Sequence, residues 1–194
     1  FSCISDITID DISSWQDKIF LTFDIDWAED FVVEPLIKLL EDNNIKATWF
    51  ITHQTKLLNR LRQNPNFEIG IHPNFNNLLN GNHENGKNSK EVLSRLLEIV
   101  PDAKSVRSHS MCQSSYLMNE FASCGLKYDC NHFIPFRSTI DCKPWLHYNG
   151  SIVKVPYFWE DDIEATLANK FDLTIPRSSK GIKVFDFHPI HTYL

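Results

Sequence analysis

The sequence predicts a single α/β domain built on a parallel sheet. Apolar, strand-like runs alternate with helix-like patterns along the whole chain in about six or seven units, as in parallel sheets with helical crossovers. The 194 residues suffice for one hydrophobic core, so we expect one domain over 1–194. The 42% apolar and 23% charged content is that of a globular protein. From this pattern alone, a closed or nearly closed barrel and an open sheet fit equally well.

Short apolar runs mark the expected strands. The first, KIFLTFDID, reads as a buried strand by composition and ends in two carboxylates. The later runs have the same length and are separated by helical patterns or turn residues. In chain order, we expect strands at 18–26, 46–53, 67–73, 106–109, 126–130, 151–159 and 182–189.

Segments with a helical apolar period lie between these strands. Pro35 suits the first turn of the first helix, Pro101 follows the clearest helix, and Gly125 terminates the next one. Two long segments break the alternation, and loops of this length commonly carry binding residues. The expected helices cover 34–42, 55–62, 89–100, 114–124 and 160–171, and the two long segments are the asparagine-rich 73–88 and the aromatic-rich 131–150.

Charge and hydropathy exclude several classes of function. With 19 basic and 25 acidic side chains the net charge is −6, so no nucleic-acid partner held by phosphate neutralisation is expected. No run approaches the roughly 20 apolar residues of a membrane span, and the first residues do not resemble a signal peptide. We therefore expect no membrane span and a cytoplasmic location. The five cysteines lack C-x-x-C spacing, which indicates buried or free thiols.

Residue types suited to chemistry follow the ends of several predicted strands. Because parallel strands all point the same way, their carboxyl ends meet at one rim, and these side chains are expected to converge there. A single carboxylate or histidine at a strand end is unremarkable, but the repetition over most strands predicts a functional site. The residues are Asp24, Asp26, His53, His72, Arg107, His109 and His188.

Two of these residues suggest a metal. Asp24 and Asp26 lie two apart on a strand, so their side chains start on the same face. Carboxylates held that close resist joint ionisation unless a cation lies beside them. One carboxylate then serves as a ligand and the other as a base, with His72 as an imidazole ligand. Arg107 would pair with the free carboxylate, and His188 would donate a proton.

Five short motifs then resemble one known family. TFDID at 22–26 resembles the T-F-D-D-G motif of the NodB-type polysaccharide deacetylases, metal-dependent members of carbohydrate esterase family four that act on N-acetylated sugars. ATWFITH and EIGIHP resemble the second- and third-strand motifs, RSHS stands in place of R-x-P-Y, and VFDFHPIH in place of the last strand. The resemblance spans roughly 18–191. It implies a distorted or incomplete (β/α) barrel of about seven parallel strands and one divalent metal ion, usually zinc.

The resemblance also implies roles for individual residues. Asp24 would be the general base, Asp26 and His72 metal ligands, Arg107 the tether of Asp24, and His188 the general acid. In the family's mechanism, metal-bound water deprotonated by the base attacks an amide carbonyl, and the acid protonates the leaving amine.

The chain departs from the family where a third ligand and the substrate contacts are expected. Asn76 stands in place of the second histidine of H-x-x-x-H, so His109 is the favoured third ligand, with His53, Asn76, Asn74 or solvent as alternatives. The substrate is expected to contact His53, Asn76, Ser110 and Trp159. The Ser110 N–H, in place of the family's tyrosine, would join the oxyanion hole, and Trp159 would stack on a sugar ring.

The expected activity is thus removal of an N-acyl, mainly N-acetyl, group from an amino sugar or polysaccharide, in cell-surface or O-antigen assembly. A D-x-D phosphohydrolase would use Asp24 as a nucleophile, but it gives no role to His72 or His188, and Ala28 lacks a hydroxyl. A D-x-D sugar-nucleotide transferase would have an acidic metal site without imidazoles. A glycan-binding barrel without catalysis is the third alternative.

Overall fold

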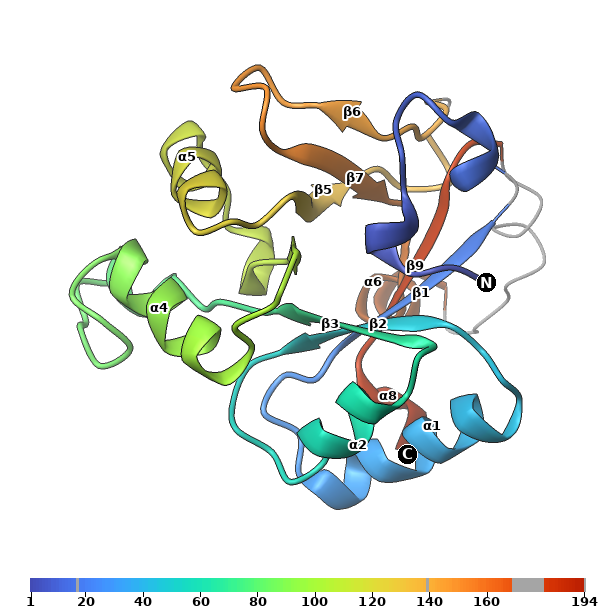
Figure 1. The fold of residues 1–194 in the computed structure, drawn as a ribbon, viewed down its shortest axis with the longest axis horizontal. Coiled ribbons are helices and arrows are strands. Elements are labelled where there is room, and N and C mark those ends of the chain that lie inside the picture. Colours follow the sequence, from blue (N-terminus) through green and yellow to red (C-terminus); the bar gives the residue numbers. More distant parts are fainter. Residues whose placement is uncertain (17, 139, 169–179, 194) are drawn as a thin grey trace.

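A parallel sheet forms the centre of the molecule, and its strand ends position the predicted site (Figure 1). The computed structural model describes residues 1–16, 18–138, 140–168 and 180–193. Within them, nine strands form one sheet in the order β6-β7-β5-β4-β3-β2-β1-β9-β8. They are β1 (Ile19–Asp24), β2 (Ala47–Ile51), β3 (Phe67–Ile71), β4 (Ser105–Val106), β5 (Tyr128–Phe133), β6 (Trp145–Leu146), β7 (Val153–Tyr157), β8 (Trp159–Glu160) and β9 (Lys183–Phe187).

The predicted strands are present, and they pair as expected. Every neighbouring pair is parallel except β6 and β7, which are antiparallel. The expected strand at 151–159 covers β7 and the first residue of β8, while β6 lies within the expected loop 131–150. This region is therefore more ordered than its sequence suggested.

One segment closes the sheet on itself. β7 pairs with β5, and β8 pairs with β9 at the opposite edge, yet only Phe158 separates β7 from β8. The N–H of Phe158 also donates a hydrogen bond to the carbonyl of Val184 at 3.3 Å. The sheet therefore curves into a distorted, incompletely paired (β/α) barrel, which confirms the expected fold.

Side chains alternate between the inside and the outside of this barrel. On β1, Phe20 lies in the inner apolar cluster and Thr22 hydrogen-bonds Asp186 on the adjacent strand β9, whereas Phe23 packs outward against the helices. The same period of two carries Asp24 to the inner face at the carboxyl end of the strand. Alternation thus points the polar residues of the strand ends into one space.

The first 16 residues, for which the sequence predicts no helix or strand, fill part of the barrel interior. Ile4, Ile7 and Trp15 are buried in the same inner cluster as Phe20 and Val184. Their burial fills the interior away from the polar end of the barrel, since Ile4 lies beside Thr48 near the start of β2.

Helices cover the outside of the sheet. In Figure 1, α1, α2 and α8 lie together on one side, and α4 and α5 lie on another. Asn88 caps α4 by accepting the N–H of Glu91, and Ser114 caps α5 by accepting that of Leu117. The helices are α1 (Asp30–Asp42), α2 (Leu58–Gln63), α3 (Asn76–Leu79), α4 (Ser89–Ile99), α5 (Ser115–Ser123), α6 (Asp161–Ala168) and α8 (Pro189–Tyr193), with short 3-10 turns η1 (Ile4–Asp6), η2 (Ile12–Ser14) and η3 (His109–Met111).

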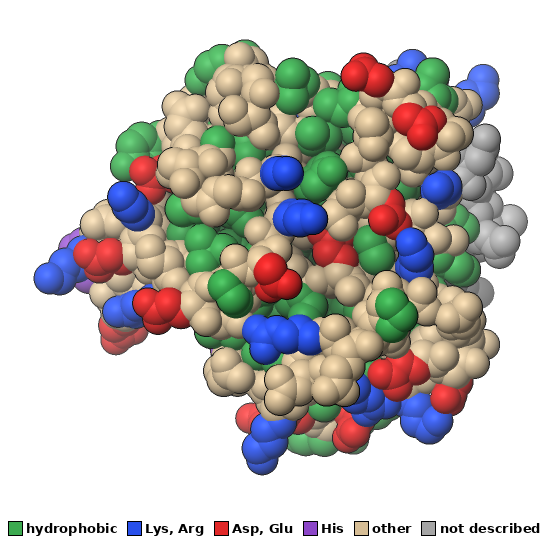
Figure 2. Space-filling model, viewed as in Figure 1, with side chains coloured by type: hydrophobic (Ala, Val, Ile, Leu, Met, Phe, Trp, Pro, Cys, Tyr) green, Lys and Arg blue, Asp and Glu red, His purple; other side chains and the backbone are tan. Residues whose placement is uncertain are grey.

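The helix expected at 160–171 appears as α6, and the rest of that prediction lies outside the described residues. Among the described residues, no helix is both long and apolar enough to cross a bilayer. On the face shown in Figure 2, Lys and Arg side chains are scattered among Asp and Glu and are not gathered into one basic stripe.

Candidate active site

The carboxyl ends of β1, β3, β4 and β9 surround one polar cavity of about 130 Å³. Most of the predicted site residues line it, and they reach it from the ends of these four strands, as the parallel arrangement requires. The lining comprises Asp24, Asp26, His72, Arg107, Ser108, His109, Ser110, Met111, Tyr157, Glu160, Asp162, Asp186 and His188.

Three of these side chains form a triangle of potential metal ligands. Asp26 Oδ1 lies 3.2 Å from His72 Nε2 and 3.2 Å from His109 Nδ1. The two nitrogens are 3.4 Å apart. Ligands at the zinc–nitrogen and zinc–oxygen distances of about 2.0–2.1 Å in a tetrahedron lie roughly 3.3 Å from one another. The donor types and their spacing therefore fit a zinc-like cation with a fourth position open toward the cavity.

The backbone places Asp26 differently from the expected strand geometry. β1 ends at Asp24, and Asp26 and Trp27 have positive φ angles of 38° and 58°. Thr52 Oγ1 accepts the N–H of Trp27 at 3.2 Å and holds this turn. The left-handed turn, and not the pleat of a strand, thus brings Asp26 to the cavity. Non-glycine residues with such angles are uncommon and cluster at functional sites.

The position of His109 depends on the loop after His72 and on a buried polar network. The His109 N–H donates to the carbonyl of Pro73 at 2.9 Å, which ties the two ligand-bearing segments together. The neighbouring Ser108 N–H donates to Asn131 Oδ1 at 2.7 Å. Asn131 in turn contacts Asp129, which is paired with buried Lys154. The sequence reading did not detect this support for His109.

Contacts within the triangle keep the carboxylate of Asp26 ionised. Burial raises the pKa of Asp26, but hydrogen bonds from His109 and His72 outweigh it and bring the pKa well below its usual range. The hydrogen bond to Asp26 raises the pKa of His109, against the effect of burial. Asp26 is therefore an ionised oxygen donor between two imidazoles.

Asp24 lies beside the triangle and is held by Arg107. Arg107 Nη1 donates to Asp24 Oδ1 at 3.0 Å and also forms a close ion pair with Asp186. The guanidinium lies between the rings of Phe50 and Tyr157, 4.7 and 4.6 Å from their centroids. Burial opposes the charge of Arg107, but Asp186 and Asp24 outweigh it and raise the pKa of the guanidinium. A permanent positive charge thus orients Asp24.

The second oxygen of Asp24 faces His72. Asp24 Oδ2 lies 3.4 Å from His72 Nδ1, and both side chains are nearly fully buried. A proton on Nδ1 is favoured beside this carboxylate, which leaves the lone pair of Nε2 for the triangle. The structure thereby separates the two aspartates: Asp26 belongs to the donor triangle and Asp24 lies behind His72.

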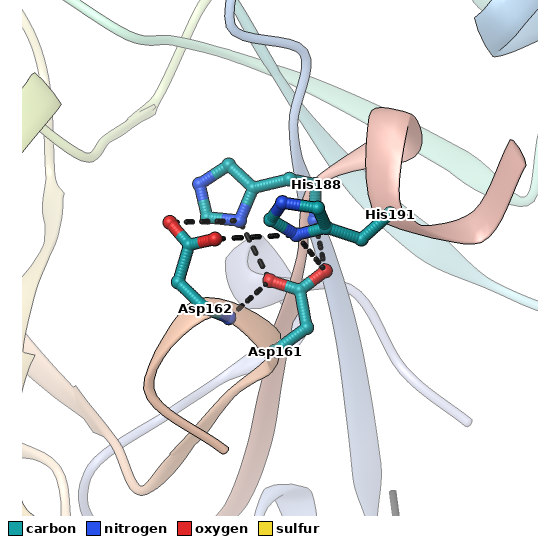
Figure 3. A group of neighbouring side chains, drawn as sticks. All are labelled: Asp161, Asp162, His188 and His191. Carbon is teal, nitrogen blue, oxygen red and sulfur yellow. Dashed lines mark hydrogen bonds and ion pairs between the residues drawn. The ribbon is translucent and has the colours of Figure 1, made fainter. Parts of the chain in front are cut away.

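His188 lies on the opposite side of the cavity with its proton shared by Asp161 (Figure 3). Asp161 accepts from the His188 backbone N–H and lies beside Nδ1, each at 2.7 Å. Nε2 faces the cavity, 3.6 Å from Asp26 Oδ2. Burial lowers the pKa of His188, but the hydrogen bond to Asp161 and the charges of Asp186 and Asp24 raise it to about 10. The sequence analysis did not identify Asp161 as the partner of His188.

The remaining residues that were expected to contact the substrate lie at different distances from the cavity. Asn76 lies at the edge of the cavity, where its Nδ2 donates to Ser110 Oγ at 3.0 Å. His53 does not line the cavity, and its Nδ1 lies 2.8 Å from Thr52 Oγ1. The prediction for Trp159 does not fit its position: the ring is 1% exposed and packs on Phe187 in the core. No face of Trp159 is open to a sugar.

Trp27 is an exposed aromatic residue beside His109. Its side chain is 46% exposed, and its ring meets that of His109 edge-on at 5.2 Å. Its position directly after Asp26 brings it to the same rim.

Several proteins of known structure are similar to this chain. No curated protein sequence matches the chain. A solved protein of Bordetella bronchiseptica, described as a candidate polysaccharide deacetylase involved in O-antigen biosynthesis, is 49% identical with a TM-score of 0.93, over 100% of this chain and 80% of that one.

Two more distant structures share the fold alone. A candidate polysaccharide deacetylase of Mycobacterium smegmatis is 17% identical with a TM-score of 0.64, over 95% of this chain and 80% of that one. The 4-alpha-glucanotransferase of Thermococcus litoralis is 14% identical with a TM-score of 0.56, over 88% and 32% of the two chains. The model of the WbmS-like polysaccharide deacetylases matches residues 21–194. This match confirms the resemblance seen in the strand-end motifs, and the chain belongs to the WbmS-like polysaccharide deacetylase family.

Proposed function

We propose that this protein is a metal-dependent hydrolase that removes an N-acetyl group from an amino sugar of a polysaccharide or of its precursor. Membership of a deacetylase family supports the reaction class. The observation that carries the metal dependence is the triangle of Asp26, His72 and His109, whose donor atoms are 3.2–3.4 Å apart. A carboxylate outside that triangle, Asp24, lies next to it and supplies a base.

Asp26, His72 and His109 would hold the cation. When bound, zinc supplies Lewis acidity to a substrate carbonyl and makes a nearby water more acidic. The protein keeps these donors in place through the turn at Asp26 and the link between His109 and Pro73. Replacement of the family's second histidine by Asn76 is therefore compensated by His109 from the next strand end.

Asp24 acts as the general base. It takes one proton from the attacking water, whose oxygen forms the new bond to the amide carbon. Arg107 fixes one oxygen of Asp24 by an ion pair, leaving the other directed toward His72. This arrangement restricts the carboxylate to one orientation before substrate binds.

His188 acts as the general acid. As the carbon–nitrogen bond breaks, Nε2 gives its proton to the departing amine, and acetate and a free amino sugar result. Asp161 on Nδ1 stabilises the imidazolium form and orients the ring. The N–H of Ser110 would hydrogen-bond the carbonyl oxygen as its charge develops, since Ser110 lines the same cavity.

The test is acetate release from N-acetylated oligosaccharides by the purified protein with measured zinc content. The 49% identical relative is linked to O-antigen biosynthesis, so O-antigen fragments with N-acetylated sugars are the first substrates to try. We expect activity with about one zinc per chain, loss of activity on chelation, and recovery on adding zinc. Cleavage of p-nitrophenyl phosphate with Mg²⁺ would instead support a phosphohydrolase. Sugar binding with neither metal nor turnover would support a glycan-binding barrel.

A further inference from the structure

We propose a second divalent-cation site, formed by Asp161, Asp162, His188 and His191 at the rim of the cavity (Figure 3). All four residues offer a donor atom, and these atoms lie within 4.8 Å of one another. The site shares His188 with the proposed catalytic machinery but none of the three residues of the first triangle. Its existence does not depend on the proposed function, whereas its effect on catalysis does.

Two elements build this cluster. Asp161 and Asp162 are the first residues of α6, and His188 and His191 flank the start of α8, directly after β9. The His191 N–H donates to the His188 carbonyl at 3.0 Å, so the three-residue spacing brings both imidazoles to one side. Figure 3 shows the two rings directed at the two carboxylates.

Each imidazole faces both carboxylates. His191 Nδ1 lies 3.3 Å from Asp161 Oδ2 and 3.2 Å from Asp162 Oδ1. His188 Nδ1 lies 2.7 Å from Asp161 Oδ1 and 3.9 Å from Asp162 Oδ2. The two separations from His191 are close to the roughly 3.3 Å between ligands of a tetrahedral zinc ion. His188 faces the other oxygen of each carboxylate, and its 2.7 Å contact with Asp161 is a hydrogen bond whose proton the cation replaces. Two nitrogens and two carboxylate oxygens are a suitable donor set for zinc.

The charge and exposure of the cluster also favour a cation. In the described part of the chain, neither Asp161 nor Asp162 pairs with lysine or arginine, and their ion-pair partners are the two histidines. The two carboxylates carry a formal charge of −2, which a divalent cation that takes the place of the His188 proton neutralises. The side chains of Asp162 and His191 are 51% and 33% exposed, so solvent reaches the site from outside, while Asp161 and His188 form its buried wall.

Occupation of this site would slow the proposed reaction. A cation on His188 Nδ1 takes the place of a proton, so the ring can no longer exist as an imidazolium ion. The neutral ring that remains is a far weaker acid toward the leaving amine. Zinc beyond the first equivalent would therefore inhibit, although the first triangle remains loaded.

The experiment measures zinc binding to the full chain by equilibrium dialysis at increasing free zinc, without reference to activity. We expect wild type to bind two equivalents, His191→Ala to keep the first and lose affinity for the second by at least about tenfold, and His109→Ala to lose the first. His83→Ala, a histidine exposed on the loop 73–88, is the matched control and should bind two.

Wild type that saturates at one equivalent, or a second equivalent kept by His191→Ala, would overturn the proposal. Circular dichroism and retention of the first equivalent show that His191→Ala is folded. Where acetate release is observed, excess zinc should lower it several-fold in wild type and less than twofold in His191→Ala. Two equivalents bound without any acetate release would leave the site in place and contradict the proposed function alone.

Discussion

The two sides of the cavity hold their polar groups at different spacings. On one side, the donors of Asp26, His72 and His109 lie 3.2–3.4 Å apart, at the long end of the hydrogen-bond range and suitable for a cation between them. On the other side, His188 and Asp161 approach to 2.7 Å, which is the spacing of a shared proton. The spacing thus supports the proposal that one side holds the first cation and that the other, until a second cation binds there, moves a proton, although both consist of histidine and aspartate.

Removal of a donor from the metal side should have the largest effect. Asp26→Ala takes away the only charged member of the triangle, so we expect zinc affinity at the first site to fall by more than about 100-fold and turnover to disappear. Metal analysis at limiting zinc, together with acetate release, checks both. Full zinc content in this variant would show that Asp26 is not a ligand.

Asp24→Asn should abolish the base and leave the metal bound. The donor triangle is intact and the amide keeps the shape of the side chain, so zinc content should match wild type while acetate release falls by about 100- to 10,000-fold. This variant is the matched partner of Asp26→Ala, since the two carboxylates are neighbours. If Asp24→Asn loses the metal and Asp26→Ala keeps it, the two roles have been assigned in reverse.

His188→Gln should act on the proton side alone. We expect acetate release to fall by about 100-fold or more with the first zinc equivalent retained at wild-type affinity, as measured by dialysis at limiting zinc. Loss of that equivalent would mean that the two sides of the cavity are not separate.

The same variant tests the pH dependence of stability in metal-free protein. Folding raises the pKa of His188 to about 10 from the ordinary 6.5, so the protonated ring stabilises the fold. This contribution is complete below about pH 6.5 and is lost as the pH rises through about 10. Between pH 7 and pH 10, the free energy of unfolding in urea should fall further in wild type than in His188→Gln, by about 1 kcal/mol or more. Equal falls would contradict the pairing with Asp161.

His53→Ala should have the smallest effect. His53 lies outside both sides of the cavity, so we expect zinc affinity and acetate release to stay within about twofold of wild type. A large loss of zinc would revive His53 as a ligand in place of His109. Dialysis and the acetate assay settle this alternative directly.

The strand-end residues were predictable because their position follows from topology. Parallel strands bring their carboxyl ends together whatever the helices between them do, so Asp24, His72, Arg107 and His188 meet as expected. His109 was one choice among several, since selecting it depends on the geometry of η3, which strand periodicity does not determine.

The error at Trp159 has a physical cause. Trp159 begins β8, and a shift of one position along so short a strand exchanges inside for outside. The sequence did not show where β8 begins, so Trp159 was assigned to the substrate although its ring is buried. Apolar periodicity does not show where a short strand such as β8 begins, nor where a left-handed turn such as that at Asp26 forms.

Because β7 continues through Phe158 into β8, the closure of the barrel also positions Asp161 against His188, the proposed general acid. Glu160 is in register with Asp186 where β8 pairs with β9. Asp161, the next residue, therefore lies at the level of His188 and contacts its imidazole. Inserting one residue at Phe158 would leave Asp26, His72 and His109 in place and yet deprive the His188 imidazole of its counterion Asp161. The junction of β7 and β8 thus fixes the position of His188, the proposed proton donor, and the proposed reaction depends on the register between β8 and β9.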